Sequence, residues 1–339
     1  MASADTRVPA ATVLVNGTAI AGVESIAVMN DLYLGANRFS VSAAISEGSV
    51  GFWSQVPLSV EVQVGLDGSW ISLILGDVDR IEIDAIRQDV KLAGRDLTAR
   101  FLTSQTQQTF ENQTSSDIVS AIVARHGLVP DVTATSNLVG RYFGTSRTRT
   151  AMYQNARATN DWDLVVWLAE IEGFDIWVDG STLHFEPPTT TGPTVTICPN
   201  DCVALSLQRS LDIAAGVSVE VKSWDCQSQQ SVSQTLTSAN STGAGVNLVI
   251  VRPNLPTGDA TLMAQQALAQ MTKHERVVSF TMPGDLTSMP RMMIALANTG
   301  TDFDGTYQVS EIERCLSLRG GFIQHVQARS VAWTPSSTT

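Results

Sequence analysis

Alternation of polar and apolar residues dominates the first ninety positions of this 339-residue chain. The segments RFSVSAAI, PLSVEVQVGLDG, WISLILGDVDRIEID and RQDVKLAGRD show this alternation and are joined by turns that contain glycine. Val60, Val62 and Val64 point to one side, whereas Glu61 and Gln63 point to the other. A period of two is typical of strands with one buried face, and short glycine turns connect antiparallel strands. The sequence therefore predicts an antiparallel β module over residues 1–93.

Helical periodicity replaces the alternation between residues 94 and 195, where the sequence predicts an α+β middle domain. The segment TSSDIVSAIVARHGL predicts a first helix, which Thr114 and Asp117 begin as a capping box and Gly127 ends. The segment NDWDLVVWLAEIEG predicts a second helix over about 161–172, capped by Asn160 or Asp161 and ended by Gly173. Its expected buried stripe is Leu164, Trp167, Leu168 and Ile171. FDIWV, Asp179-Gly180 and STLHFEP then predict a hairpin with a two-residue turn.

Alternating segments return over residues 196–225 and 276–333, which predict a second β module. Between them, residues 226–275 begin with a stretch rich in Ser, Gln and Thr, which we expect to be a surface excursion. A helix follows, with Leu262, Met263, Leu268 and Met271 expected to face inward. The two β segments share an order of strand, loop, Pro-led strand and Gly-marked turn, which is a weak repeat signal. The predicted class is α+β with mostly antiparallel strands and two similar β modules around the middle domain.

Composition limits the classes of partner. The chain is 43% hydrophobic and 16% charged, so it has the composition of a folded protein. A formal charge of -12 does not favour binding to nucleic-acid phosphates or anionic membranes. No apolar run reaches the length of a membrane span, so we expect no membrane anchor. The first residues lack the pattern of a secretory signal, so we expect synthesis and assembly in a cytoplasm.

Four carboxylates on the second helix raise the question of an acidic active site: Asp161, Asp163, Glu170 and Glu172. Asp163 and Glu170 share one side of the helix, and Asp161 and Glu172 share another. Within each pair the Cα atoms are about 10 Å or more apart, whereas glycosidase carboxyls lie ~5 to 9.5 Å apart. We expect solvated acids beside an apolar stripe, although a catalytic partner from elsewhere in the fold stays open.

Other motifs of catalysis or cofactor binding are also missing from the sequence. Cys198 and Cys202 lack the second ligand pair of a zinc site, and Cys226 and Cys315 do not supply it. The histidines His126, His184, His274 and His325 have no ligand spacing, and G-x-S-x-G is absent. The glycine-rich STGAG has neither the lysine of a P-loop nor the spacing of a dinucleotide fingerprint. We therefore predict no catalytic, cofactor-binding or metal-binding residue and no enzymatic activity.

Basic residues concentrate in a stretch without acids between residues 132 and 160. It contains Arg141, Arg147, Arg149 and Arg157. In an acidic chain such a stretch favours an electrostatic contact with an acidic neighbour or with a copy of the chain. Scattered surface arginines explain the pattern equally well.

Several segments resemble the tail hub proteins of contractile-tailed phages, the late control gene D family, which is related to the hub part of type VI secretion spike proteins. The resemblance spans most of residues 70–330. It lies in the segment that begins with Tyr153-Gln154, in GRDLTARFLTSQTQQTFENQTSSDIVSAIVARHGL and in FDGTYQVSEIERCLSLRGGFIQHVQARS. The motif residues it matches are structural ones: Gly94, Arg95, Asp96, Asp161, Trp162, Asp163, Glu170, Glu172 and Gly173.

This resemblance implies two related β-barrel-like modules per chain and a homotrimeric, pseudo-six-fold ring. Such a hub joins a six-fold tail tube to a three-fold central spike in a virion tail that assembles in the bacterial cytoplasm. Its expected partners are its own copies, tail tube or distal tail proteins and a separate spike protein, while DNA only passes through. No spike β-helix or lysozyme domain follows VAWTPSSTT, so we expect piercing and peptidoglycan cleavage to belong to a separate partner protein.

Two other functions remain open from the sequence. A cell-wall hydrolase of the tail tip would use Asp or Glu from the middle domain. A carbohydrate- or receptor-binding tail module would stack sugars on exposed tryptophans, for which the candidates are Trp162, Trp167, Trp177 and Trp224.

Overall fold

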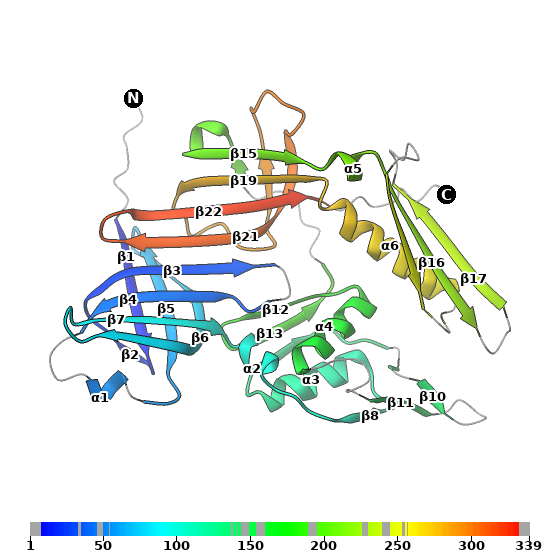
Figure 1. The fold of residues 1–339 in the computed structure, drawn as a ribbon, viewed down its shortest axis with the longest axis horizontal. Coiled ribbons are helices and arrows are strands. Elements are labelled where there is room, and N and C mark those ends of the chain that lie inside the picture. Colours follow the sequence, from blue (N-terminus) through cyan, green and yellow to red (C-terminus); the bar gives the residue numbers. More distant parts are fainter. Residues whose placement is uncertain are drawn as a thin grey trace. The chain divides into compact units, whose positions relative to one another are not determined.

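The computed structural model describes residues 8–32, 35–45, 50–53, 55–136, 138–139, 141–143, 149–153, 160–188, 195–225, 230–238, 245–252, 255 and 257–331. The chain forms two compact units. Unit 1 comprises residues 1–190, 283–288 and 311–324, and unit 2 comprises residues 191–282, 289–310 and 325–339. Strands β21 (Gly305–Ser317) and β22 (Gly321–Ser330) each contribute residues to both units (Figure 1). The four-part division drawn from the sequence stays a prediction.

An antiparallel sheet forms the first part of unit 1, as the alternating pattern predicted. Its strands are β1 (Pro9–Val15), β2 (Thr18–Ala19), β3 (Val23–Asp31), β4 (Arg38–Ala44), β5 (Ser59–Leu66), β6 (Ser69–Asp84) and β7 (Asp89–Asp96). The short helix α1 (Val50–Trp53) falls between β4 and β5 in the chain. With the unit 1 part of β21, the strand order is β21-β3-β4-β7-β6-β5-β1-β2.

The apolar residues of this sheet meet in one core. Val13 of β1, Val28 of β3 and Val62 of β5 are fully buried in the same cluster, which also contains Phe322 of β22. A single sheet whose strands all face one core must curl round it, and bulges in β5–β6 and β6–β7 add local twist. The prediction of a barrel-like module needs correction. Among the described strands, β1 and β2 at one end of this order do not pair with β21 at the other end, so the sheet does not close into a barrel. With only two residues in β2, the ladder ends there and the sheet stays open.

The second part of unit 1 packs helices against two small sheets. The helices are α2 (Thr98–Leu102), α3 (Ser115–Arg125) and α4 (Asp161–Glu172). One sheet contains β8 (Thr109–Glu111), β10 (Arg141–Phe143) and β11 (Arg149–Tyr153), and the other contains β9 (Val129–Val132), β12 (Asp175–Asp179) and β13 (Thr182–Glu186). Their core draws its buried residues from positions 97 to 185 alone, among them Phe101, Ile122 and Leu168.

Local signals in this part are confirmed. Thr114 and Asp117 exchange both hydrogen bonds of a capping box at the start of α3. Asn160 caps α4 by accepting a hydrogen bond from the Asp163 amide at 2.8 Å. Gly173 ends α4 in the left-handed conformation, with a φ of 70°. The predicted hairpin joins β12 to β13 in antiparallel register, but Asp179 pairs with Thr182, so the two-residue turn is Gly180-Ser181, one position later than predicted.

The buried face of α4 differs from the predicted stripe. Leu164 and Leu168 are fully buried, but Ile171 is 39% exposed. The buried arc is centred on Asp161, Val165 and Leu168, so Ile171 lies at its margin. Compared with the prediction, the helix is turned about its own axis so that the side chain of its first residue, Asp161, is buried in the core.

Unit 2 contains a sheet in the order β15-β19-β22-β21, in which β15 (Ala204–Arg209) pairs with β19 (Arg276–Pro283). Strand β20 (Met293–Leu296) pairs with β21 and with β14 (Val195–Ile197). The short helices η2 (Pro199–Asp201) and α5 (Leu211–Ala214) flank β15 in the chain. Buried residues such as Phe280, Ile294 and Val309 form its interior.

Unit 2 also contains three strands and a helix with a core of their own. Strand β16 (Val217–Asp225) lies between β17 (Gln230–Thr237), to which it is antiparallel, and β18 (Val246–Val251), to which it is parallel. Helix α6 (Thr257–Thr272) packs on this sheet. The polar segment expected to be a surface excursion thus includes a strand, β17. No helix in the described part of the chain is long and apolar enough to cross a membrane.

The inward face of α6 also differs from the prediction. Leu262 is 46% exposed, whereas Ala260, Ala264 and Leu268 are buried and follow one another at intervals of four residues. Two alanines and Leu268 thus face the sheet, and Leu262 lies on the exposed side of the helix. Met263 and Met271 pack at the margin of the core.

Candidate functional site

Asp161, the first residue of α4, is the centre of a buried polar cluster. Its side chain is fully buried, although the sequence predicted a solvated acid. Oδ2 lies 2.6 Å from Arg125 Nη2 and 2.7 Å from His126 Nε2, and Oδ1 accepts a hydrogen bond from Thr106 Oγ1 at 2.7 Å. The Asp161 amide donates to the Ser104 carbonyl. One carboxylate therefore joins the start of α4 to the end of α3 and to the segment after α2.

The four acids of α4 lie in different surroundings. Asp163 and Glu170 are exposed, and Glu172 accepts a hydrogen bond from Ser115 Oγ at 2.5 Å. Ser115 begins α3, whereas the partners of Asp161 lie at its other end. The rise of a helix over ten residues separates these two contacts by about 15 Å. Asp161 and Glu172 are therefore too far apart for a glycosidase pair, which needs ~5 to 9.5 Å.

The Gly94-Arg95-Asp96 motif fixes the end of β7. A Cβ on Gly94 would lie 2.2 Å from the Asp77 carbonyl oxygen, so no side chain fits there. Arg95 binds Asp79 through two hydrogen bonds, of 2.6 and 2.9 Å. Gly94 and Arg95 therefore have structural roles in unit 1.

Asp96 is a buried carboxylate with local partners. It accepts hydrogen bonds from Asn37 Nδ2 at 2.7 Å and from the Thr98 amide at 3.1 Å. Asn37 in turn accepts a hydrogen bond from the Asp31 amide. Burial raises the pKa of Asp96 to about 6, and the hydrogen bonds from Thr98 and Asn37 offset only part of that rise. The carboxylate connects the loop before β4 to the start of α2.

The basic stretch is only partly described. Arg141 lies on β10 opposite Ala151, and Arg149 lies on β11 opposite Phe143. Arg147 and Arg157 lie outside the described residues. The proposed electrostatic interface of these four arginines stays a prediction.

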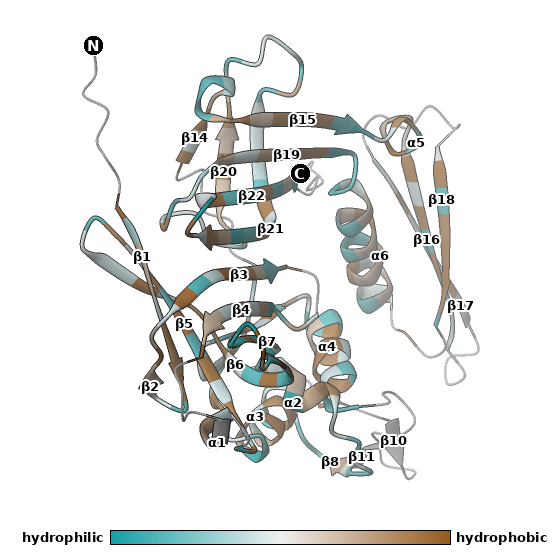
Figure 2. Cartoon of the chain, turned by 60° about the vertical axis from the view of Figure 1, so that its left-hand side comes forward, coloured by the Kyte–Doolittle hydropathy of each residue, from teal (hydrophilic) through white to brown (hydrophobic). Residues whose placement is uncertain are grey.

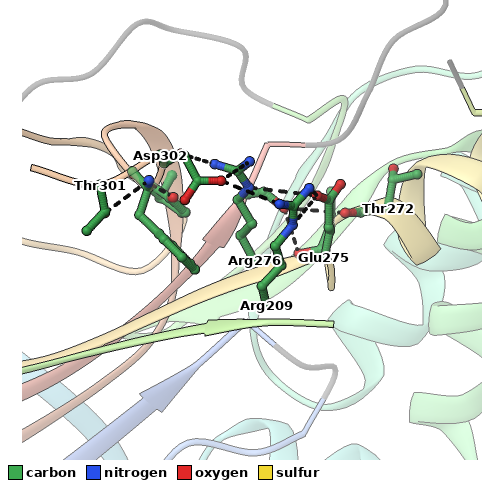
Figure 3. Close-up of polar contacts among 10 residues, drawn as sticks. Arg209, Thr272, Glu275, Arg276, Thr301 and Asp302 are labelled. Carbon is green, nitrogen blue, oxygen red and sulfur yellow. Dashed lines mark hydrogen bonds and ion pairs between the residues drawn. The ribbon is translucent and has the colours of Figure 1, made fainter. Parts of the chain in front are cut away.

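Unit 2 contains an ion cluster that the sequence did not predict (Figure 3). Arg209 of β15 lies beside Arg276 of β19 in the strand register. Arg209 Nη2 is 2.9 Å from Glu275 Oε1, and Arg276 Nη2 is 3.2 Å from Asp302 Oδ2. Asp302 also lies 3.4 Å from Arg209, and the Arg276 guanidinium lies 5.4 Å from the centroid of the Phe303 ring. Two carboxylates neutralise two adjacent cations, so the cluster ties the loop before β21 to β15 and β19.

Arg314 of β21 is a buried charged residue that the sequence did not predict. Its side chain is buried, and it donates hydrogen bonds to the Asp285 and Ser288 carbonyls. Burial lowers the pKa of Arg314 to about 10. In the sequence, Arg314 is one residue of an alternating strand pattern. No local signal indicates that its side chain contacts Ser288, 26 residues earlier.

The tryptophans proposed for sugar stacking lie in different surroundings. Trp162 is buried in the core of unit 1, and Trp167 is partly buried against it. Trp177 stacks on His184 with a centroid distance of 4.6 Å. Trp224 of unit 2 is 51% exposed. Among the described residues, no group of His, Cys, Asp or Glu has the arrangement of a metal site.

The architecture is that of bacteriophage tail proteins. A tail protein from Neisseria meningitidis MC58 is similar over 95% of this chain and 96% of its own, with a TM-score of 0.72 and 14% identity. The 43 kDa tail protein of prophage MuSo2 from Shewanella oneidensis covers 95% and 98%, with a TM-score of 0.71 and 14% identity. A type VI secretion component from Escherichia coli covers 95% and 77%, with a TM-score of 0.58 and 10% identity. The resemblance predicted from the sequence is confirmed at the level of the fold.

By sequence, residues 57–249 match the family described as the Alg8 N-terminal domain. The match covers more than half of the chain, and the protein belongs to this family. The matched region includes the Gly94-Arg95-Asp96 motif and helix α4. Comparison with the curated proteins gives no match.

Proposed function

We propose that this protein is the structural hub of a phage tail or of a phage-like injection device. The observation that carries the proposal is the length of the structural likeness. The likeness spans 95% of this chain and 96% and 98% of two phage tail proteins. It therefore involves nearly the whole fold of each tail protein and not a single shared domain. The E. coli protein, described as a component of the type VI secretion system, has the same fold at lower similarity.

In this proposal three copies form a ring that joins a six-fold tail tube to a three-fold spike. Each chain contributes two β modules, so three chains present six similar units. The partners are other copies of the chain, tail tube or distal tail proteins and a separate spike protein, and DNA passes through the ring. The protein resides in the virion tail. Open sheets support an assembly role, because edge strands offer unpaired backbone groups to a neighbour.

The arrangement of the carboxylates supports a role without catalysis. Asp161 is fully buried and bonded to Arg125, His126 and Thr106, so it has no access to a polysaccharide. Glu172 and Asp161 contact opposite ends of α3. These are the contacts of a packing unit, and the hydrolase alternative has no pair of facing carboxylates in α4.

The first experiment is the solution mass by light scattering after size exclusion, at micromolar concentration. We expect three times the 36.3 kDa of one chain. A strict monomer would contradict self-assembly into a hub. In that case release of soluble fragments from purified peptidoglycan should be measured next, because turnover would favour the hydrolase alternative.

A further inference from the structure

Strand β18 of unit 2 lies at a sheet edge but has the sequence of an interior strand. Its six residues, VNLVIV, include no charge, proline or glycine. Leu248 and Ile250 point toward the side of α6 and are half-buried. On the opposite face Val249 is 52% exposed and Val251 is 70% exposed. Figure 2 shows that β18 is largely hydrophobic. Strands that are apolar on both faces are typically covered on both faces.

Apart from β17, the other outer strands of the described sheets are protected. Strands β2 and β14 have only two and three residues. The remaining ones carry a charge or a proline: β1 has Pro9, β8 has Glu111, β9 has Pro130 and Asp131, β10 has Arg141, β12 has Asp175 and Asp179, and β15 has Arg209. Short, charged or proline-containing edges prevent uncontrolled pairing. An apolar edge of six β-forming residues without these features is a site for another strand.

The opposite edge of the same sheet is β17, and it is also free of charge and proline. Its sequence is QSVSQTLT, with Val232 and Leu236 packed against the core. Helix α6 packs over β16 and β17. Helix α6 therefore lies next to the β17 edge. At the β18 edge, the half-buried Leu248 and Ile250 could be covered by a helix from another copy.

We propose that the β18 edge of one copy pairs with the β17 edge of the next copy. Helix α6 of that second copy would then extend over Leu248 and Ile250. The hydroxyl-bearing face of β17 would lie beside Val249 and Val251 and reduce their exposure. Because the two edges differ, the contact is head-to-tail, and such a contact builds a closed ring when the rotation between copies closes. The inference rests on the proposed trimeric hub and names the surface that closes it.

The test places a lysine on either edge, since an edge lysine blocks strand pairing. Val249→Lys changes β18, and Thr235→Lys changes the exposed face of β17 opposite Glu220. Ile86→Lys is the matched control, because Ile86 is 95% exposed on a turn of unit 1. By light scattering we expect wild type and Ile86→Lys to have the mass of three chains. We expect Val249→Lys and Thr235→Lys to fall to the mass of one chain.

Circular dichroism and urea unfolding must show that the monomeric variants are folded, and Val251→Lys replaces Val249→Lys if that variant is not. Trimeric Val249→Lys beside trimeric wild type would overturn this interface and leave the hub proposal intact. Loss of the trimer in Val249→Lys but not in Thr235→Lys would overturn the assignment of β17 as the partner. A monomeric wild type would contradict the hub's self-assembly itself.

Discussion

At the scale of single residues, Asp96 gives the chain a pH-dependent stability. Its pKa in the folded state is about 6, against 3.8 for an ordinary aspartate. The folded chain therefore takes up this proton before the unfolded chain does. The contribution to stability is fully present below pH 3.8 and is lost as the pH rises through 6.

The variant Asp96→Asn should remove this dependence. As the pH falls from 7 to 4, the free energy of unfolding of wild type should rise relative to that of the variant by about 2 kcal/mol. Urea unfolding of both proteins at pH 4, 5, 6 and 7 measures the difference, and other titrating groups cancel in it. A difference that stays constant over this range would contradict the raised pKa.

Residue roles were predictable from sequence only where the partner is near in the chain. Thr114 and Asp117 are three residues apart, and their capping box was predicted correctly. Asp161 meets Arg125 and His126 from 36 and 35 residues away. Nothing in NDWD distinguishes the buried acid from the exposed Asp163, because both suit the first turn of a helix. Only tertiary packing decides which of them lies inside.

At the scale of elements, the Asp161 cluster attaches the start of α4 to the end of α3. In the variant Asp161→Asn the buried carboxylate is lost while Arg125 and His126 remain. Removing one partner of a buried pair leaves the other charge uncompensated. Arg125 is one-third exposed and can turn to solvent, which reduces the cost to about 2 to 3 kcal/mol of unfolding free energy. Chemical denaturation followed by circular dichroism measures the loss.

Asp163→Asn is the matched control, because it makes the same chemical change two residues later on the exposed face of α4. Its effect should be about 0.5 kcal/mol or less. Equal losses in the two variants would show that helix-dipole effects, rather than the buried cluster, account for the stabilisation.

Elements of unit 1 were easier to predict than those of unit 2. The alternation of β4 to β7 and the caps of α3 and α4 are local signals, and they gave the correct elements. Strand β17 was missed because QSVSQTLT is almost entirely polar, and its strand conformation depends on pairing with β16. The face of α6 was missed because alanines, rather than the larger Leu262, face the sheet.

At the scale of the molecule, unit 1 depends on strands that are distant in sequence. Residues 311–317 of β21 pair with residues 25–31 of β3. Phe322 lies in the same core as Val28 and Val62. The sequence predicted similar β modules at the two ends of the chain, but alternation does not reveal which strands pair. A strand that completes a sheet nearly 300 positions away has no local signature.

This dependence gives a last prediction. A fragment of residues 1–190 lacks the strand that pairs with β3, so β3 becomes an unprotected edge and the core loses Phe322. The second part of unit 1 keeps all its buried residues, because they lie between positions 97 and 185. In hydrogen-exchange mass spectrometry the amides of β3 that face β21 should exchange rapidly in the fragment, while those of α3 stay protected. Joining residues 283–324 to the fragment through a Gly/Ser linker should restore β3. Protection of β3 in the unlinked fragment would mean that the first seven strands are stable without β21, and Phe322 would then contribute little to that core.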